Sequence, residues 1–111
     1  MTDTAAPATN EELRAVLLRI RAENEADLTR ARATLADLSA SGLLSDPSMR
    51  EESTNAEYLI EDASTIITKV DAALARMDAG TYGVCTRCGA PIGPGRLRVR
   101  PYEPTCVTCS S

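Results

Sequence analysis

The sequence predicts a mainly α-helical protein, in which a long antiparallel helical hairpin, a coiled coil, precedes a small four-cysteine finger. Two stretches of about 30 residues repeat apolar side chains at the three- and four-residue spacings of a helix. All four cysteines follow the second stretch, and the 111-residue chain has no Trp or Phe with which to fill a globular core. We therefore expect three parts: a disordered N-terminal segment at 1–8, the hairpin at 9–79 with its tip near 40–48, and the finger at 80–111.

The first expected helix begins at Thr9. Thr9-x-x-Glu12 fits a capping box, in which the hydroxyl and the carboxylate each accept a hydrogen bond from a backbone amide at the helix start. The apolar stripe that follows contains one polar residue, Asn24, and the doubled spacing of four at this point is a stutter, which should unwind the seam locally. The stripe consists of Leu13, Leu17, Ile20, Asn24, Leu28, Ala31, Leu35 and Leu38.

A turn is expected between residues 39 and 48, where Ser and Gly interrupt the pattern. Asp46 followed by Pro47 is a favoured helix opening, because the Asp side chain can accept a bond from an early amide and Pro fits the first helical position. Ser48, with Glu51 three residues later, is a competing cap.

The second expected helix has the more regular stripe, which alternates spacings of four and three across three heptads. Gly80 then offers a C-cap after Ala79. Two such helices joined by a short turn must lie antiparallel. The stripe consists of Ala56, Ile60, Ala63, Ile67, Val70, Leu74 and Met77.

The predicted interface between the two helices is thin, so a bare two-helix hairpin would be marginally stable. Either the finger clamps the base of the hairpin, or two hairpins pair into a four-helix bundle. Residues 80–83 leave almost no linker between the second helix and the cysteines, and this short connection favours a clamped monomer over a dimer.

Composition and charge exclude several classes of function. His is absent, which removes Ser/His/Asp and Cys/His catalysis and His-ligated zinc. Residues 1–79 carry 15 acids and 8 bases, a net charge of −7, whereas residues 80–111 carry one acid and four arginines, a net charge of +3. Direct DNA binding by the acidic hairpin is therefore disfavoured. No long apolar run and no leader peptide is recognisable, so we expect a cytoplasmic protein without a membrane segment.

The cysteines form two pairs, Cys85-x-x-Cys88 and Cys106-x-x-Cys109, separated by 17 residues. This spacing suits four thiolates around one tetrahedral zinc ion, with mononuclear iron, an iron–sulfur cluster or redox disulfides as alternatives. The intervening residues are poor in large apolar side chains, so metal binding, on the order of 10 to 16 kcal/mol, must supply the folding free energy of the finger. Four sulfur ligands leave no open coordination position, so we expect a structural zinc and no enzyme activity.

The residues around these cysteines resemble the zinc-finger signature of the DksA/TraR family of bacterial transcription factors. The resemblance rests on Tyr82-Gly83-x-Cys85-x-x-Cys88-Gly89-x-x-Ile92-x-x-x-Arg96-Leu97-x-x-x-Pro101-x-x-x-x-Cys106-x-x-Cys109. It implies a regulator that binds RNA polymerase, inserts its hairpin into the secondary channel through which nucleotides reach the active site, and brings acidic tip residues near the catalytic magnesium. A helix of about 30 residues spans about 45 Å, which is long enough to reach into such a channel.

The tip departs from the family pattern, which resembles Asp-Pro-x-Asp-Arg followed by an Ala. Asp46 and Arg50 match this pattern, whereas Met49 and Glu51 stand where the second Asp and the Ala would fall. The resemblance therefore implies a polymerase-facing tip with one of its two acids missing. The C-terminal helix of larger relatives is also not seen after Cys109.

Relatives that respond to guanosine tetraphosphate use a basic residue late in the second helix, an Arg before the finger proline and a Lys after the last Cys. Lys69, Arg100 and Ser110 occupy these positions, so two of the three are basic here. The resemblance implies guanosine tetraphosphate as a possible effector. Alternatively, Lys69 pairs with a neighbouring carboxylate and Arg100 is solvated.

Two rival interpretations remain open at this point. The chain could be a zinc-clamped interaction module that dimerises or docks on another protein. It could also be a dithiol redox switch that works through its two Cys-x-x-Cys pairs.

Overall fold

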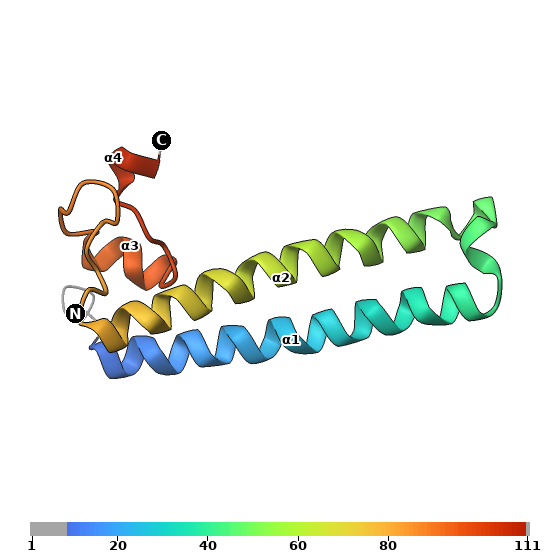
Figure 1. Ribbon diagram of the computed structural model, residues 1–111, viewed down its shortest axis with the longest axis horizontal. Helices are drawn as coiled ribbons and strands as arrows, with labels where there is room; N and C mark the ends of the chain where they lie inside the picture. The colour runs from blue at the N-terminus through green and yellow to red at the C-terminus, as the bar shows by residue number, and fades with distance from the viewer. Residues whose placement is uncertain (1–8, 111) are drawn as a thin grey trace, which may run out of the picture. The chain divides into compact units, whose positions relative to one another are not determined.

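The computed structural model (Figure 1) describes residues 9–110. The described part is mainly helical and has no strand, which confirms the predicted hairpin of two long helices with a small four-cysteine finger. The N-terminal segment 1–8 lies outside the described residues. None of the helices within 9–110 has the length and apolarity needed to cross a membrane. The elements are α1 (Asn10–Ala40), the 3-10 helices η2 (Leu43–Ser45) and η3 (Pro47–Met49), α2 (Arg50–Ala79), α3 (Pro94–Val99) and α4 (Val107–Ser110).

The first helix begins with the capping box that the sequence predicts. The backbone amide of Thr9 donates to Glu12 Oε1 at 2.9 Å, and the amide of Glu12 donates to Thr9 Oγ1 at 3.1 Å. These two reciprocal bonds satisfy amides that have no acceptor within the helix, so they fix where α1 starts.

The chain divides into two compact units. One unit combines the chain up to Ile20 with the chain from Lys69 onward, and the other spans Arg21–Thr68. The first unit contains the start of α1, the end of α2 and the finger. The second contains the remainder of both helices and the connection between them.

The helical part of the first unit has a tightly packed apolar seam. Leu17 of α1 and Val70 of α2 are fully buried, with 0% of their surface exposed. Since burying one such side chain contributes about 1.5 to 3 kcal/mol, this seam is a main source of stability in its unit. Its other buried members are Leu13, Ala73 and Met77.

The seam of the second unit is built largely from small side chains. Ala31 of α1 and Ala56 and Ala63 of α2 are buried, and Leu38 is the larger buried residue near the end of α1. Asn24 is half-buried, in keeping with its predicted place on the apolar face. Larger side chains along these helices are half-buried and add to the apolar area removed from water, among them Leu28, Leu35, Ile60 and Ile67.

The connection between the long helices is a pair of short 3-10 turns. Gly42 precedes the first turn in the left-handed region, at φ 75°, where a residue with a Cβ would be strained. Asp46 then caps the second turn: its Oδ1 accepts bonds from the backbone amide of Ser48 at 2.9 Å and from the hydroxyl of Ser48 at 2.8 Å. The Asp46 cap is therefore present, but it opens η3, and α2 starts three residues after Pro47, at Arg50.

Candidate metal centre and the exposed turn

The finger is organised around a small core of three buried side chains, Cys85, Ile92 and Leu97. Tyr82 packs against this core and donates a hydrogen bond from its hydroxyl to the carbonyl of Pro101 at 2.7 Å. Burial raises the pKa of the Tyr82 hydroxyl, so it remains a donor at neutral pH. The core is too small to stabilise about 30 residues without help, as the sequence predicts.

The first cysteine pair, Cys85 and Cys88, lies in a tight turn. The amide of Gly89 donates to the carbonyl of Cys85 at 3.0 Å, and Gly89 has a φ of 79°, which favours glycine. The amides of Arg87 and Cys88 point at Cys85 Sγ, at 3.4 Å and 3.5 Å. Backbone N–H groups aimed at a sulfur stabilise its thiolate form.

The second cysteine pair, Cys106 and Cys109, frames the start of α4. The amide of Ser110 donates to the carbonyl of Cys106 at 3.0 Å and closes the turn. A backbone bond of 2.9 Å from the amide of Thr86 to the carbonyl of Pro104 joins the segments that carry the two pairs. The two pairs, far apart in sequence, are thus brought to one place.

The four sulfur atoms lie within 4.8 Å of one another. Zn–S bonds of about 2.3 Å in a tetrahedral site require sulfur–sulfur separations of about 3.8 Å. The separation between Cys88 Sγ and Cys106 Sγ, 3.7 Å, agrees with that value. A set of four sulfurs without any nitrogen or oxygen donor is the set that structural zinc prefers, so the residues fit this ion.

The electrostatics of the cluster favour a cation at its centre. The backbone amide of Cys106 and then that of Cys88 lower the pKa of the Cys85 thiol to about 6. The amide of Cys109 likewise lowers the pKa of Cys106, whereas bonding to the sulfurs of Cys88, Cys85 and Cys106 raises the pKa of Cys109 to about 12. The crowding of the sulfurs thus opposes a fourth negative charge, and a divalent ion at the centre offsets it, because metal ligation requires the thiolate form.

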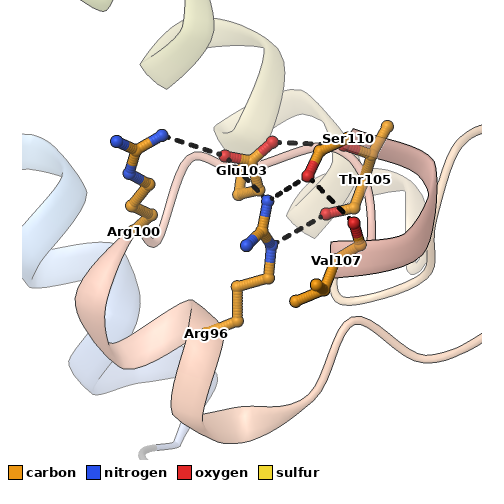
Figure 2. A network of polar contacts seen from close by, with 6 residues as sticks. All are labelled: Arg96, Arg100, Glu103, Thr105, Val107 and Ser110. Atoms are coloured by element: carbon orange, nitrogen blue, oxygen red, sulfur yellow. Dashed lines mark hydrogen bonds and ion pairs between the residues drawn. The ribbon is translucent and has the colours of Figure 1, made fainter.

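A network of polar contacts surrounds the second cysteine pair, and the sequence did not predict it. Figure 2 shows Arg96 of α3 reaching toward Thr105 and Ser110, with Glu103 beside it. Residues 80–111 contain four arginines but a single acid, Glu103. This excess of arginines is the sequence signal from which an ion pair of Glu103 with an arginine could have been inferred. The Glu103 carboxylate lies 3.6 Å from Arg96 Nη2 and 3.7 Å from Arg100 Nη1.

The residues predicted for the tip lie around η3. Asp46 and Met49 are half-buried, whereas Arg50 and Glu51 are exposed in the first turn of α2. The amide and hydroxyl of Ser48 lower the pKa of the Asp46 carboxyl, so this group is ionised at neutral pH. The structure thus places one acid, Asp46, at the turn as the N-cap of η3, and a second acid, Glu51, at the start of the following helix.

The residues predicted for a nucleotide effector are both exposed and belong to the first unit. Lys69 lies on α2, and Arg100 is the C-cap of α3. The third position, Ser110, accepts a bond from Arg96 Nη2 at 2.7 Å. Arg100 Nη1 lies 3.7 Å from Glu103 Oε1, and the Arg100 side chain remains 62% exposed to solvent.

Both the finger and the overall fold are similar to those of known proteins. Residues 80–110 match the family described as the prokaryotic dksA/traR C4-type zinc finger. The solved structure of the transcription factor DksA2 from Pseudomonas aeruginosa is similar with a TM-score of 0.68 and 32% identity, over 88% of this chain and 77% of that one.

Two curated relatives are similar over shorter stretches. The RNA polymerase-binding transcription factor DksA of Haemophilus influenzae is 31% identical over 67 residues, which are 60% of this chain and 46% of that protein. The protein of the same name from Caulobacter vibrioides is 50% identical over 36 residues, which are 32% of this chain and 25% of that protein. The chain thus spans less than half the length of these curated relatives.

Family, donor set and sulfur geometry agree on the metal, which is one structural zinc ion. The similarity to a solved structure extends beyond the finger, since it covers most of the chain at an identity above 30%. We conclude that this chain belongs to the DksA/TraR family of C4-type zinc-finger proteins.

Proposed function

We propose that the chain is a regulator of transcription, without enzyme activity of its own, that binds RNA polymerase and inserts its hairpin into the secondary channel. The observation that carries this proposal is the similarity to DksA2 over 88% of the chain, which includes both hairpin and finger. The curated relatives are named for RNA polymerase binding.

The distribution of charge supports a protein partner over DNA. Residues 1–79, which include the hairpin, carry a net charge of −7, because 15 acids stand against 8 bases. Four thiolates and one Zn²⁺ add a net −2 to the finger, which lowers its charge from +3 to about +1. Neither part is suited to neutralising the phosphates of DNA, whereas an acidic arm is compatible with a channel that admits nucleotides and leads to a metal ion.

The proposed probing tip has one well-placed acid. Both bonds from Ser48 go to Asp46 Oδ1, so the second carboxylate oxygen is not used by the cap. Met49 cannot provide a second charge, and Glu51 is on α2. We therefore expect docking in the channel with a weaker effect on initiation than a tip with two acids would have.

Guanosine tetraphosphate is a possible effector within this proposal, with Lys69 and Arg100 as its cationic contacts. Glu103 already pairs with Arg100, and an incoming anion has to compete with this carboxylate. Ser110 adds no charge and already bonds to Arg96. We therefore expect any nucleotide response to be weaker than that of a site with three cations.

The insertion is tested by loading Fe²⁺ at the magnesium site of core RNA polymerase and mapping hydroxyl-radical cleavage of this chain. We expect cuts around Asp46. The control is the chain with Fe²⁺ in the absence of polymerase, which identifies cuts caused by iron bound at the four cysteines. A chain that binds polymerase yet is not cut near Asp46 would contradict insertion.

Binding itself is tested by capture of core polymerase in competition with a transcript-cleavage factor that occupies the secondary channel. We expect this chain and the cleavage factor to displace each other from the polymerase. Binding without competition would indicate docking elsewhere on the enzyme, and sedimentation as a stable dimer without polymerase binding would favour the self-associating interaction module.

A further inference from the structure

Arg96 contacts both ends of the second cysteine pair. Its Nε donates to the carbonyl of Thr105, the residue before Cys106, at 3.1 Å. Its Nη2 donates to the hydroxyl of Ser110, the residue after Cys109, at 2.7 Å. One rigid guanidinium therefore spans the short segment that supplies two of the four sulfurs.

The guanidinium is itself held in place. Glu103 Oε1 lies 3.6 Å from Arg96 Nη2, and the side chains are only 12% and 22% exposed, respectively. The other oxygen of the same carboxylate, Oε2, accepts a bond from the hydroxyl of Thr105 at 3.2 Å. The contact between Arg96 and Glu103 is an ion pair, and because both side chains are largely buried it is screened less by solvent than a surface pair would be.

The helix that carries Arg96 is anchored in the core of the finger. Arg96 lies in α3, next to Leu97, which is buried in the finger core against Cys85. The contacts of Arg96 therefore connect the core around the first cysteine pair with the segment of the second pair. Arg87 also reaches this segment, through a bond of 3.4 Å from its Nη1 to the carbonyl of Cys109.

We propose that Arg96, oriented by Glu103, is a positioning residue for the metal centre: it holds the second cysteine pair at the separation that zinc requires and thereby slows the loss of the ion. Arg96 touches no sulfur, so it acts through the backbone at Thr105 and the side chain of Ser110. Outer-sphere contacts of this kind typically change metal affinity by about 10- to 100-fold.

The test measures zinc release from the full-length zinc-loaded chain to an excess of a chromogenic chelator. Arg96→Gln is expected to release zinc roughly 10-fold faster than the wild type. Arg96→Lys keeps the charge but not the two-pronged geometry, so an intermediate rate is expected. Glu103→Gln, which keeps the shape of the side chain, should also accelerate release. The matched control is Arg100→Gln, since Arg100 pairs with Glu103 but has no bond to Thr105 or Ser110.

A spectroscopic readout separates positioning from general loss of stability. In the Co²⁺-substituted chain, the visible absorption bands report the arrangement of the sulfurs. We expect Arg96→Gln to shift these bands while the helical circular dichroism is unchanged, and Arg100→Gln to shift neither.

Two results would overturn the proposal. One is zinc release from Arg96→Gln at the rate of Arg100→Gln. The other is equal acceleration in every variant with unshifted Co²⁺ bands, which would mean that any change in α3 loosens the finger. Should Arg96→Gln fail to fold, Glu103→Gln and Arg96→Lys decide the matter by the same two measurements.

Discussion

Arg14 Nη2 lies 3.0 Å from Asp78 Oδ1, so an ion pair joins the beginning of α1 to the end of α2. The two side chains are 42% and 73% exposed, and solvent screens such a pair strongly. We expect Arg14→Gln to lower the free energy of unfolding by about 0.2 to 1 kcal/mol. Urea unfolding of both single variants and the double variant with Asp78→Asn measures the coupling. A coupling well above about 1 kcal/mol would show that the pair is shielded more than its exposure suggests.

The buried seam should contribute far more than this ion pair. Leu17 is completely buried, and truncation of such a side chain to alanine typically lowers stability by about 2 to 5 kcal/mol. We therefore expect Leu17→Ala to lower the urea midpoint strongly. Its neighbour Leu18 on the same helix is 50% exposed, so Leu18→Ala is the matched control, with an expected change within about 0.5 kcal/mol. Similar losses in both variants would contradict the observed orientation of α1.

The helices and their faces could be predicted because they depend on local periodicity. The capping box of Thr9 and Glu12, the half-buried Asn24 and the buried Val70 all follow from spacing alone. Ala73 was not included in the predicted second stripe, yet it is fully buried, whereas the predicted Leu74 is half-buried. A stripe assigned by the size of its side chains favours leucine over a small residue that fits where the helices approach closely.

The finger could be predicted only in part. Its four cysteines are recognisable from their spacing, but the bonds from Arg96 to Thr105 and Ser110 depend on how α3 lies across the second cysteine pair. Likewise, Asp46 was recognisable as a cap, but the 3-10 turn between it and α2 was not. Such tertiary and turn geometries carry no periodic signal in the sequence.

The hydroxyl of Tyr82 should stabilise the finger through its bond to the carbonyl of Pro101. Tyr82→Phe leaves that partly buried carbonyl without its donor, so we expect a loss of about 0.5 to 1.5 kcal/mol in the zinc-loaded protein. The control is Tyr58→Phe, because Tyr58 is 66% exposed on α2. Thermal unfolding in the presence of zinc measures both. Equal midpoints for Tyr82→Phe and the wild type would mean that water replaces the hydroxyl.

Removal of zinc should unfold the finger and spare most of the helical signal. The long helices α1 and α2 contain 31 and 30 residues, whereas α3 and α4 contain 6 and 4. A chelator should therefore expose residues 80–110 to proteases and speed their amide exchange, with only a small fall in circular dichroism. Renewed zinc should reverse both effects. Protected amides between Cys85 and Cys109 in the metal-free chain would contradict a finger that depends on its metal.

The Asp46 cap should make the stability of the turn depend on pH. The amide of Ser48, followed by its hydroxyl, lowers the pKa of Asp46 below its ordinary value of 3.8. Because the folded-state pKa is the lower one, the ionised cap stabilises the folded state fully above about pH 4. Its contribution is lost as the pH falls through the folded-state pKa.

Asp46→Asn isolates this contribution, since asparagine is also a good cap but does not titrate. Unfolding of the wild type and Asp46→Asn is compared from neutral pH downward, with Glu52→Gln as the matched control for removal of one nearby acid. We expect the advantage of the wild type over Asp46→Asn to shrink below pH 3.8, while Glu52→Gln shows no such local change at the turn in amide exchange. A constant difference between the wild type and Asp46→Asn over the whole range would mean that the carboxylate at the tip is not held by Ser48, and that its charge is free to act elsewhere.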